Sequence, residues 1–395
     1  MKKKYMVHGI SRAASWVFTF SLKMALKVFV IPSKYNCVYS RKDVLRSLMY
    51  LSLKSEYAEG GLEILERRLR CHYRYGKVPD ADTFLYRLKK MRRSEALAML
   101  HQLNGEVVSM AKRKGAFRRK AVTAIDLTFI PYYGKPTPYV VQGQYKLGTT
   151  WFHCYAAIRI VERGRRYVIK SRLVKPLELS EKDKIVEELV TEARRQGVHI
   201  RLLLLDKGFY SHEVIETLKA RRVKFLIAAP KNSRVKAAIL DYFRTGKRQV
   251  RKFHLKKGGE TVNFNLTIHR LRRTKKGLRN ILELYGAFAT NLGFKNAVRA
   301  WQTLPRDYRR RWGIETGFRV EKGFRAKTTS KNETVREIYH QYAIALENLW
   351  TLHNMKEAKR RNLPLDQMKR PLVKVKEFTL DFIFCTLTSY NLKPG

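Results

Sequence analysis

Acidic residues are scarce in this sequence. Only 33 Asp and Glu residues stand against 83 Lys and Arg in a chain of 395 residues, which gives a formal net charge of +50 at pH 7. A folded chain with this charge repels itself unless a polyanion offsets it. The basic residues are spread along the whole chain and are not gathered in one amphipathic helix, which favours a nucleic acid over an anionic membrane surface as the partner.

Cysteines and long apolar runs are also few. The four cysteines lie far apart and form no C-x2-C pair, which argues against a disulfide framework or a structural zinc site and indicates a reducing, intracellular compartment. Residues 13–31 are the one membrane-like stretch, but Lys23 and Lys27 interrupt it, and its uninterrupted part is too short to span ~30 Å of hydrocarbon. We therefore expect a core helix or a basic amphipathic helix here, no membrane association, and a cytoplasmic, nucleoid-associated protein.

What is present is enough apolar material for a folded core. The chain is 45% hydrophobic and 11% aromatic, which excludes a disordered basic tail, and its length predicts roughly two to three domains. From Ser40 to about Lys112 the pattern is helical, and Ser40 with Asp43 predicts a capping box at the start of one helix. Such helices suit a DNA-binding domain, and equally any helical bundle.

After Lys120 the pattern changes. Three β-type runs, a helix, the apolar strand IRLLLLD, a second helix and a further strand follow one another, which indicates an α/β layout with a partly parallel sheet. Residues 231–283 interrupt this order with many Lys and Arg and with an alternation of apolar and polar residues, which predicts a basic β-hairpin insertion. Aromatic side chains in a basic segment can stack on a DNA base. No Trp lies in this segment, so the candidates are Tyr242, Phe253 and Phe264.

The expected organisation has five parts. They are an N-terminal helical DNA-binding region (1–119), the first part of the α/β core (120–230), the basic β insertion (231–283), the second part of the core (284–362) and a C-terminal tail (363–395).

Two aspartates stand in or after apolar strands. Asp126 lies inside the run AVTAIDLTFI, where a carboxylate is costly unless it is hydrogen-bonded, paired or bound to a metal. Asp206 ends the strand IRLLLLD, at the carboxyl end where α/β sheets bind ligands. Taken alone, each has an ordinary structural explanation as a strand-edge or turn residue.

A third carboxylate stands in the segment YRRRWGIETGFRVEK. If this segment is one helix, Tyr308, Arg311, Glu315 and Lys322 share a sector of about 60° on one face. One carboxylate among two cations and a phenol suits a metal bound beside a DNA phosphate, although mixed charges are also common on an ordinary surface helix.

These residues resemble a known family. The spacing Tyr308-x2-Arg311-x3-Glu315-x6-Lys322 matches at every position the Y-x2-R-x3-E-x6-K signature of the DDE transposases of bacterial and archaeal insertion sequences. The segments AIDLT and LLLLDKGFYS look like the first and second catalytic segments of that group, and the resemblance covers about residues 122–354.

The resemblance implies a fold and a set of residue roles. The fold would be an RNase H-like core, a mixed five-stranded sheet flanked by helices, interrupted by the basic β-rich insertion and preceded by an N-terminal helical domain. Asp126, Asp206 and Glu315 would be the catalytic residues and would bind two Mg²⁺ ions, with Mn²⁺ as a substitute. Tyr308, Arg311 and Lys322 would contact the DNA at the element end.

The implied function is that of a DNA transposase. Such an enzyme would bind the terminal inverted repeats of its insertion sequence as a homodimer on paired ends, cleave them by two-metal hydrolysis and join the freed 3′-OH ends to target DNA. Two alternatives stay open on the sequence: an RNase H-like nuclease without strand transfer, and a catalytically inactive DNA-binding descendant of a transposase. An RNA-binding basic protein would explain the charge but not the carboxylates.

Overall fold

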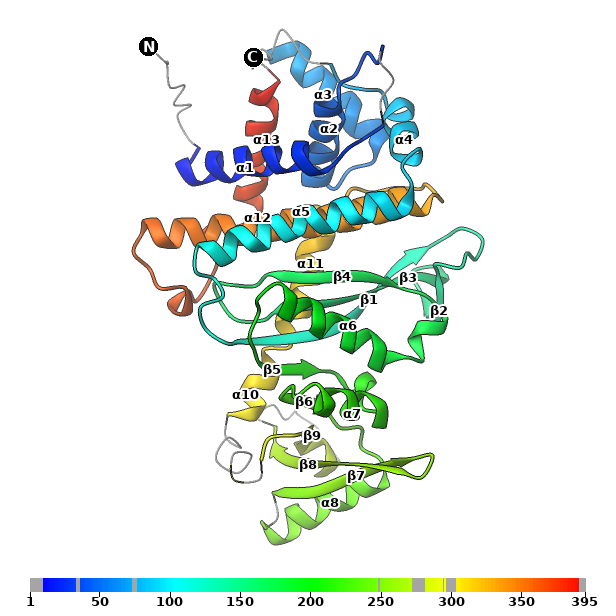
Figure 1. Cartoon of the computed structure of the whole chain (residues 1–395), viewed down its shortest axis with the longest axis vertical. Coiled ribbons are helices and arrows are strands. Elements are labelled where there is room, and N and C mark those ends of the chain that lie inside the picture. The colour runs from blue at the N-terminus through cyan, green and yellow to red at the C-terminus, as the bar shows by residue number, and fades with distance from the viewer. Residues whose placement is uncertain are drawn as a thin grey trace. The chain divides into compact units, whose positions relative to one another are not determined.

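The computed structural model describes residues 10–32, 36–72, 77–247, 249–271, 281–293, 295 and 303–390 (Figure 1). Contacts divide the chain into two compact units. The helical unit comprises Met1–Ala116, Arg163–Val168 and Thr316–Gly395, and the sheet unit comprises Phe117–Glu162 and Ile169–Glu315.

The helical unit is built from N-terminal and C-terminal helices together. Those before the sheet are α1 (Arg12–Val28), α2 (Arg41–Lys54), α3 (Ala58–His72), α4 (Ala81–Lys89) and α5 (Arg93–Arg113). Those after it are the end of α11 (Trp312–Phe324), α12 (Glu333–Arg360), the short η4 (Leu365–Gln367) and α13 (Val375–Ser389), which lies within the segment expected to form the tail. The long helices α5 and α12 pack against each other, and α1 contacts α5, α12 and α13.

The apolar helix near the N-terminus is a core helix. In α1 the residues Val17, Phe18 and Ala25 are buried, and Ser11 caps the helix by accepting a hydrogen bond from the Ala14 N–H at 3.0 Å. The expectation of a core helix is confirmed. Across the described residues, no helix combines the length and the apolar character needed to cross a membrane.

A buried amide ties α12 to two other parts of the helical unit. Asn348 is fully buried, and its Oδ1 accepts a hydrogen bond from the Val168 N–H at 2.8 Å. Its Nδ2 donates to Asn104 Oδ1 and to the Val168 carbonyl, both at 2.7 Å. Because a buried polar group must keep its partners, this residue aligns α5, α12 and the start of a strand.

The sheet unit holds one mixed sheet. Its strands are β1 (Ala121–Tyr132), β2 (Val141–Lys146), β3 (Thr149–Ile160), β4 (Val168–Val174), β5 (Ile200–Leu205), β6 (Phe225–Ala228), β7 (Val250–Lys257), β8 (Glu260–Arg270) and β9 (Tyr285–Thr290). The order is β2-β3-β1-β5-β6-β9-β8-β7, and β4 also pairs with β3. Strand β1 runs antiparallel to β3 and parallel to β5, and β5 runs parallel to β6.

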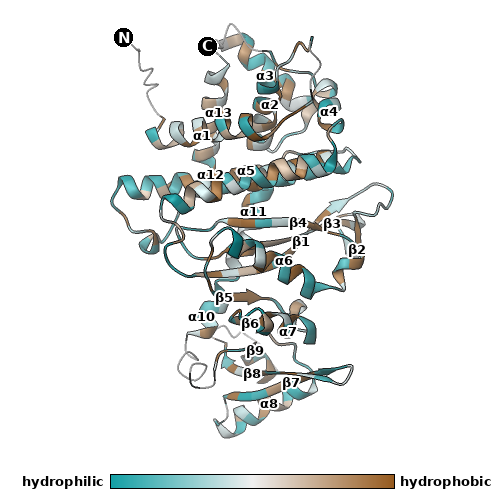
Figure 2. Ribbon diagram, in the orientation of Figure 1, coloured by the Kyte–Doolittle hydropathy of each residue, from teal (hydrophilic) through white to brown (hydrophobic). Residues whose placement is uncertain are grey.

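This sheet confirms the expected fold class. Strands β4, β3, β1, β5 and β6 form the expected five-stranded mixed core, and β2, β9, β8 and β7 extend it to nine strands in the described part of the chain. The sheet unit also contains the helices α6 (Lys182–Arg195), α7 (His212–Ala220), α8 (Ser233–Thr245) and α10 (Leu304–Arg309), with the short η1 (Leu177–Leu179), η2 (Lys207–Phe209) and η3 (Ile281–Leu284). The last four residues of β5 are buried, in keeping with the apolar colour of this strand in Figure 2.

The basic insertion forms the expected hairpin, but it also contains a helix. Strands β7 and β8 pair antiparallel, and their turn uses Gly258 and Gly259 at φ of 55° and 84°, where glycine is favoured. The preceding segment, which was predicted only as part of the hairpin insertion, is helix α8. Its apolar stripe of Val235, Ala238 and Ile239 is short and is flanked by Arg234 and interrupted by Lys236, and it packs against β8 in one buried cluster.

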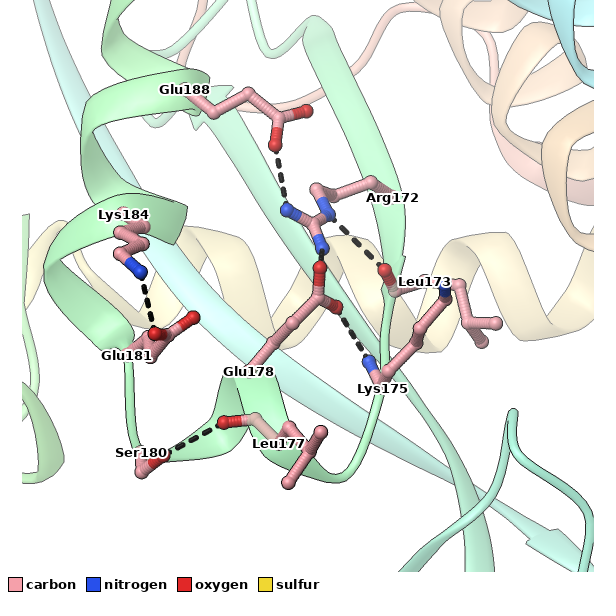
Figure 3. A network of polar contacts seen from close by, with 9 residues as sticks. All are labelled: Arg172, Leu173, Lys175, Leu177, Glu178, Ser180, Glu181, Lys184 and Glu188. Carbon is pink, nitrogen blue, oxygen red and sulfur yellow. Dashed lines mark hydrogen bonds and ion pairs between the residues drawn. The ribbon is translucent and has the colours of Figure 1, made fainter.

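The connection from β4 to α6 is held by an arginine (Figure 3). The Arg172 guanidinium pairs with Glu178 and, at 2.6 Å, with Glu188 of α6, and its Nε donates to the Leu173 carbonyl at 3.1 Å. Glu178 in turn accepts a hydrogen bond from the Lys175 N–H at 2.7 Å. Glu178 lies in η1 and Glu188 lies in α6, so this network connects both elements to Arg172 of β4 and holds α6 relative to the sheet.

Candidate active site

Two neighbouring parallel strands carry the two aspartates. In the register between β1 and β5, Ala124 lies opposite Leu204. Asp126 and Asp206 each follow two residues later, so both side chains leave the sheet at equivalent positions on the same face. The parallel pairing therefore brings together two carboxylates that are far apart in the sequence.

Asp126 is a largely buried carboxylate with both oxygens engaged. Its side chain is 16% exposed. Oδ1 accepts a hydrogen bond from the Leu127 N–H at 2.9 Å, and Oδ2 accepts one from Arg311 Nη1 at 3.0 Å. Burial is the main reason that the pKa of this carboxyl group is raised to about 6; the Leu127 N–H and Arg311 oppose the rise, and the negative charges of Asp206 and Glu315 add to it.

Asp206 shapes the turn that follows β5. Its Oδ1 accepts a hydrogen bond from the Gly208 N–H at 2.8 Å, which caps η2. A Cβ atom at residue 208 would lie 3.0 Å from that oxygen, so glycine permits the close approach. Lys182 of α6 reaches this turn, where its Nζ donates to the Gly208 carbonyl at 2.7 Å. No pattern in the sequence singled out Lys182.

The segment that carries the third carboxylate is not one helix. Helix α10 ends at Arg309, and α11 begins at Trp312, with Arg310 and Arg311 in the turn between them. The prediction of a single continuous helical face from residue 308 to residue 322 is therefore wrong. The turn is closed by hydrogen bonds three residues apart, such as the Arg311 N–H to the Tyr308 carbonyl at 2.9 Å, which are tighter than those of an α-helix.

The tight turn still brings three signature residues together. Arg311 Nη2 donates to Glu315 Oε1 at 2.7 Å, and its guanidinium carbon lies 5.7 Å from the centre of the Tyr308 ring. That ring packs against Phe288 of β9 with centroids 4.6 Å apart, and burial raises the pKa of Tyr308 to about 12. Tyr308 is therefore a protonated phenol at neutral pH.

Gly313 sits where α11 approaches the sheet. A Cβ atom here would lie 3.3 Å from Cβ of Val161, just after β3. The glycine thus lets the first turn of α11, with Glu315 on it, lie close to the sheet. Glycine in a helix costs about 1 kcal/mol relative to Ala, and the close packing of α11 on the sheet offsets this cost.

Lys322 belongs to the other unit. It is an exposed residue of α11, seven residues after Glu315, and lies in the part of that helix that belongs to the helical unit. Its neighbour Glu321 is buried, and Oε1 of Glu321 lies 3.2 Å from His340 Nδ1 and 3.4 Å from Arg325 Nη1.

The three carboxylates are suited to hard divalent cations. All offer oxygen ligands, which Mg²⁺ and Mn²⁺ prefer, and no His or Cys is needed. Their oxygens do not all lie within 4.8 Å of one another. The Arg311 guanidinium lies between Asp126 and Glu315 and bonds to both.

A second group of ligand-type side chains was missed by the sequence reasoning. His212 and Glu216 of α7 and Glu260 of β8 bring their ligand atoms within 4.8 Å of one another. The spacing of His212 and Glu216 puts them one helical turn apart, which the sequence could have shown. Glu260 comes close only through the packing of α7 on the hairpin.

Of the three aromatic residues expected to stack on a DNA base, the buried Phe264 is excluded, whereas Tyr242 and Phe253 are half-buried. Phe264 is 5% exposed, and its ring packs against Tyr210 and Phe253 with centroids 5.9 and 6.2 Å away. Tyr242 packs against Tyr285 at 5.9 Å. Phe264 is thus part of a core and is not free to stack on a base.

Comparison with known proteins decides the family. Residues 118–346 match the family described as "Transposase DDE domain", which is more than half of the chain. The chain belongs to this family. It is a DNA-cleaving, transposing enzyme, and the family uses divalent metal ions.

A solved structure shares its fold. The chain is similar to a piggyBac transposase in a synaptic complex with hairpin DNA, with a TM-score of 0.55 and 12% identity over 96% of this chain and 78% of that one. A Mos1 mariner transposase in a paired-end complex with Mn also matches, with a TM-score of 0.19 and 12% identity over 52% of this chain and 65% of that one. No curated protein matches the chain.

Proposed function

We propose that the chain is the transposase of an insertion sequence of the group with the Y-x2-R-x3-E-x6-K signature. It binds the double-stranded terminal inverted repeats of its element, cuts them and joins the freed 3′-OH ends to target DNA. The observation that carries the proposal is the meeting of Asp126, from the centre of the sheet, with Arg311 and Glu315 of the signature segment. These residues lie far apart in the sequence and yet form one bonded group.

Asp126, Asp206 and Glu315 are proposed as the catalytic carboxylates and as the ligands of two Mg²⁺ ions, for which Mn²⁺ can substitute. Two such ions stabilise the entering and leaving oxygens of an in-line displacement at phosphorus. In this proposal the chain supplies the three carboxylates from β1, from the end of β5 and from α11. Water attacks the phosphorus atom and the P–O3′ bond breaks, so that a 3′-OH is freed. That 3′-OH then attacks a phosphorus atom of the target strand, so that a new P–O3′ bond forms while the target's own P–O3′ bond breaks and a target 3′-OH leaves.

The remaining signature residues are proposed to hold the DNA. Arg311 can form paired hydrogen bonds with a phosphate, and the protonated Tyr308 can donate one. Lys322 supplies a point charge for a further phosphate. We propose that the protein acts as a homodimer on paired ends, which mass measurement of the complex with element-end DNA would test.

The experiment is cleavage of a labelled element end, whose sequence can be taken from the inverted repeats that flank the gene. Asp126→Ala, Asp206→Ala and Glu315→Ala are each expected to abolish cleavage while DNA binding is retained, and EDTA is expected to stop the parent protein. Normal cleavage by any one variant would remove that residue from the site. Lys184→Ala, a change on the exposed face of α6, is the matched control and should cut normally.

Joining to a target separates the proposal from its closest alternative. A nuclease of the same fold would cut the end but leave the 3′-OH free, whereas the proposed enzyme produces a covalent product with target DNA. An inactive descendant would bind the end and do neither.

A further inference from the structure

Arg311 occupies the position between two of the three proposed metal ligands. Its Nη1 lies 3.0 Å from Asp126 Oδ2, and its Nη2 lies 2.7 Å from Glu315 Oε1. The side chains of Arg311 and Asp126 are 14% and 16% exposed, so the bond between them is largely shielded from water, whereas Glu315 is 35% exposed. A charge-assisted pair with this shielding is stronger than a surface ion pair.

Both carboxylate oxygens of Asp126 already accept a hydrogen bond. Oδ1 is held by the Leu127 N–H, a backbone group of β1 that cannot move without distorting the strand. Oδ2 is held by Arg311, a long side chain in the turn between two helices. A divalent ion that approaches Asp126 Oδ2 therefore meets the positive charge of Arg311, and of these two partners the arginine is the one that can rotate away.

DNA offers the arginine a replacement partner. A phosphate group accepts two parallel hydrogen bonds from a guanidinium, as the two carboxylates do here. When a phosphate takes Arg311, the positive charge leaves the carboxylates and their oxygens become available to cations.

We propose that Arg311 is a gate that couples DNA binding to metal binding. In the DNA-free protein it closes Asp126 and Glu315 to divalent ions, and the phosphate backbone of the bound DNA draws it away. Metal then binds more tightly to the protein–DNA complex than to the protein alone, and by linkage DNA binds more tightly in the presence of metal. The inference rests on the proposed function, since it takes Asp126 and Glu315 as metal ligands. In this inference Arg311 acts through Asp126 and Glu315, so it is a positioning residue.

The test measures the affinity of the full-length protein for Mn²⁺ by the loss of the free-ion electron paramagnetic resonance signal. Arg311→Gln removes the charge and is expected to raise the Mn²⁺ affinity of the DNA-free protein by about 5-fold or more, the lower end of ordinary coupling between sites. A pre-cleaved element end, which cannot be hydrolysed again at the same bond, is expected to raise the Mn²⁺ affinity of the parent protein but not that of this variant.

Arg310→Gln is the matched control. Arg310 is the adjacent residue, and it faces Glu162 at 3.6 Å and Asp307 at 3.4 Å, away from the proposed ligands. This variant should bind Mn²⁺ like the parent protein, with or without DNA. If Arg311→Gln does not fold, Arg311→Lys replaces it, because a single ammonium cannot hold both carboxylates in the same way, and a smaller rise in affinity is expected.

The outcomes separate the inference from the proposed function. Unchanged or weaker Mn²⁺ binding by both Arg311 variants, or an equal rise in Arg310→Gln, would overturn the gate while leaving the metal site intact. Unchanged Mn²⁺ binding by Asp126→Ala would instead overturn the proposed site itself.

Discussion

Asp126→Asn is expected to make the protein more stable and inactive at the same time. The carboxyl group has a pKa of about 6 in the folded chain, against an ordinary value of 3.8, because it is buried near two other carboxylates. A difference of about two pH units corresponds to about 3 kcal/mol of unfavourable free energy for the charged form in the folded protein. The amide keeps the shape of the side chain without the charge. The gain in the free energy of unfolding should therefore reach up to about 3 kcal/mol at pH 8.

The sign of the pH dependence follows from the raised pKa. Between pH 3.8 and about 6 the folded state holds a proton that the unfolded state has released, so this group favours folding below pH 3.8 and loses that contribution as the pH rises through 6. Asn does not titrate. The advantage of the variant over the parent protein should thus be largest above pH 7 and should vanish near pH 4.

The assay is urea-induced unfolding of both proteins at pH 8 and at pH 4.5, with cleavage of a labelled element end measured in parallel. Asp206→Asn serves as the comparison: it should also lose cleavage, but its oxygen caps η2 and its replacement offers no comparable gain in stability. A variant at residue 126 that is less stable than the parent protein at pH 8, or whose advantage is the same at both pH values, would refute the reasoning.

Three further changes test the structure around the site. Gly313→Val should destabilise the protein by about 1–3 kcal/mol, because its side chain would press on Val161, and a wild-type unfolding midpoint would contradict the close approach of α11. Burial lowers the pKa of His269 to about 4, so this residue favours folding above pH 6.5 and loses that contribution as the pH falls toward 4; His269→Phe should show a flatter loss of stability over that range in thermal unfolding, and parallel curves would argue against it. Asn348→Leu should cost about 2 kcal/mol or more in urea-induced unfolding because it removes the partner of the buried Val168 N–H and leaves the Val168 carbonyl with the longer hydrogen bond from Asn104 Nδ2 at 3.3 Å, and a cost below about 1 kcal/mol would show that other groups replace the amide.

Binding strength should also depend steeply on salt. With so many basic residues, log K for DNA should fall by roughly 0.9 for each phosphate neutralised as log[salt] rises. Fluorescence anisotropy between about 50 and 200 mM salt measures this slope. A nearly flat response would contradict a partner held by its phosphates.

Much of the local structure could be predicted from the sequence because it depends on neighbouring residues. The capping box of Ser40 and Asp43 is confirmed, and so are the buried strand before Asp206 and the hairpin of the insertion. Arg311 and Glu315, four residues apart, were expected on one face, and they are in contact. The family match agrees with the motif resemblance, although the signature group itself stays a prediction.

Other features were decided only by tertiary structure. Asp126 and Asp206 lie on the same face of the sheet because of the register between two parallel strands. A shift of that register by one residue would send one of the two side chains to the other face. The helical pattern of the sequence continues without interruption through residues 308–322, but the structure has a turn there, between α10 and α11. This turn contains Arg311, which reaches Asp126 on the sheet.

The hydrogen bond between Asp126 and Arg311 shows both what the sequence determines and what only the tertiary structure decides. The sequence shows both residues, and it shows that a carboxylate in an apolar strand needs a partner such as a positive charge. Their meeting depends on how the chain folds over the 185 positions that separate them. Contacts of that range are set by packing and strand order, which no local pattern encodes.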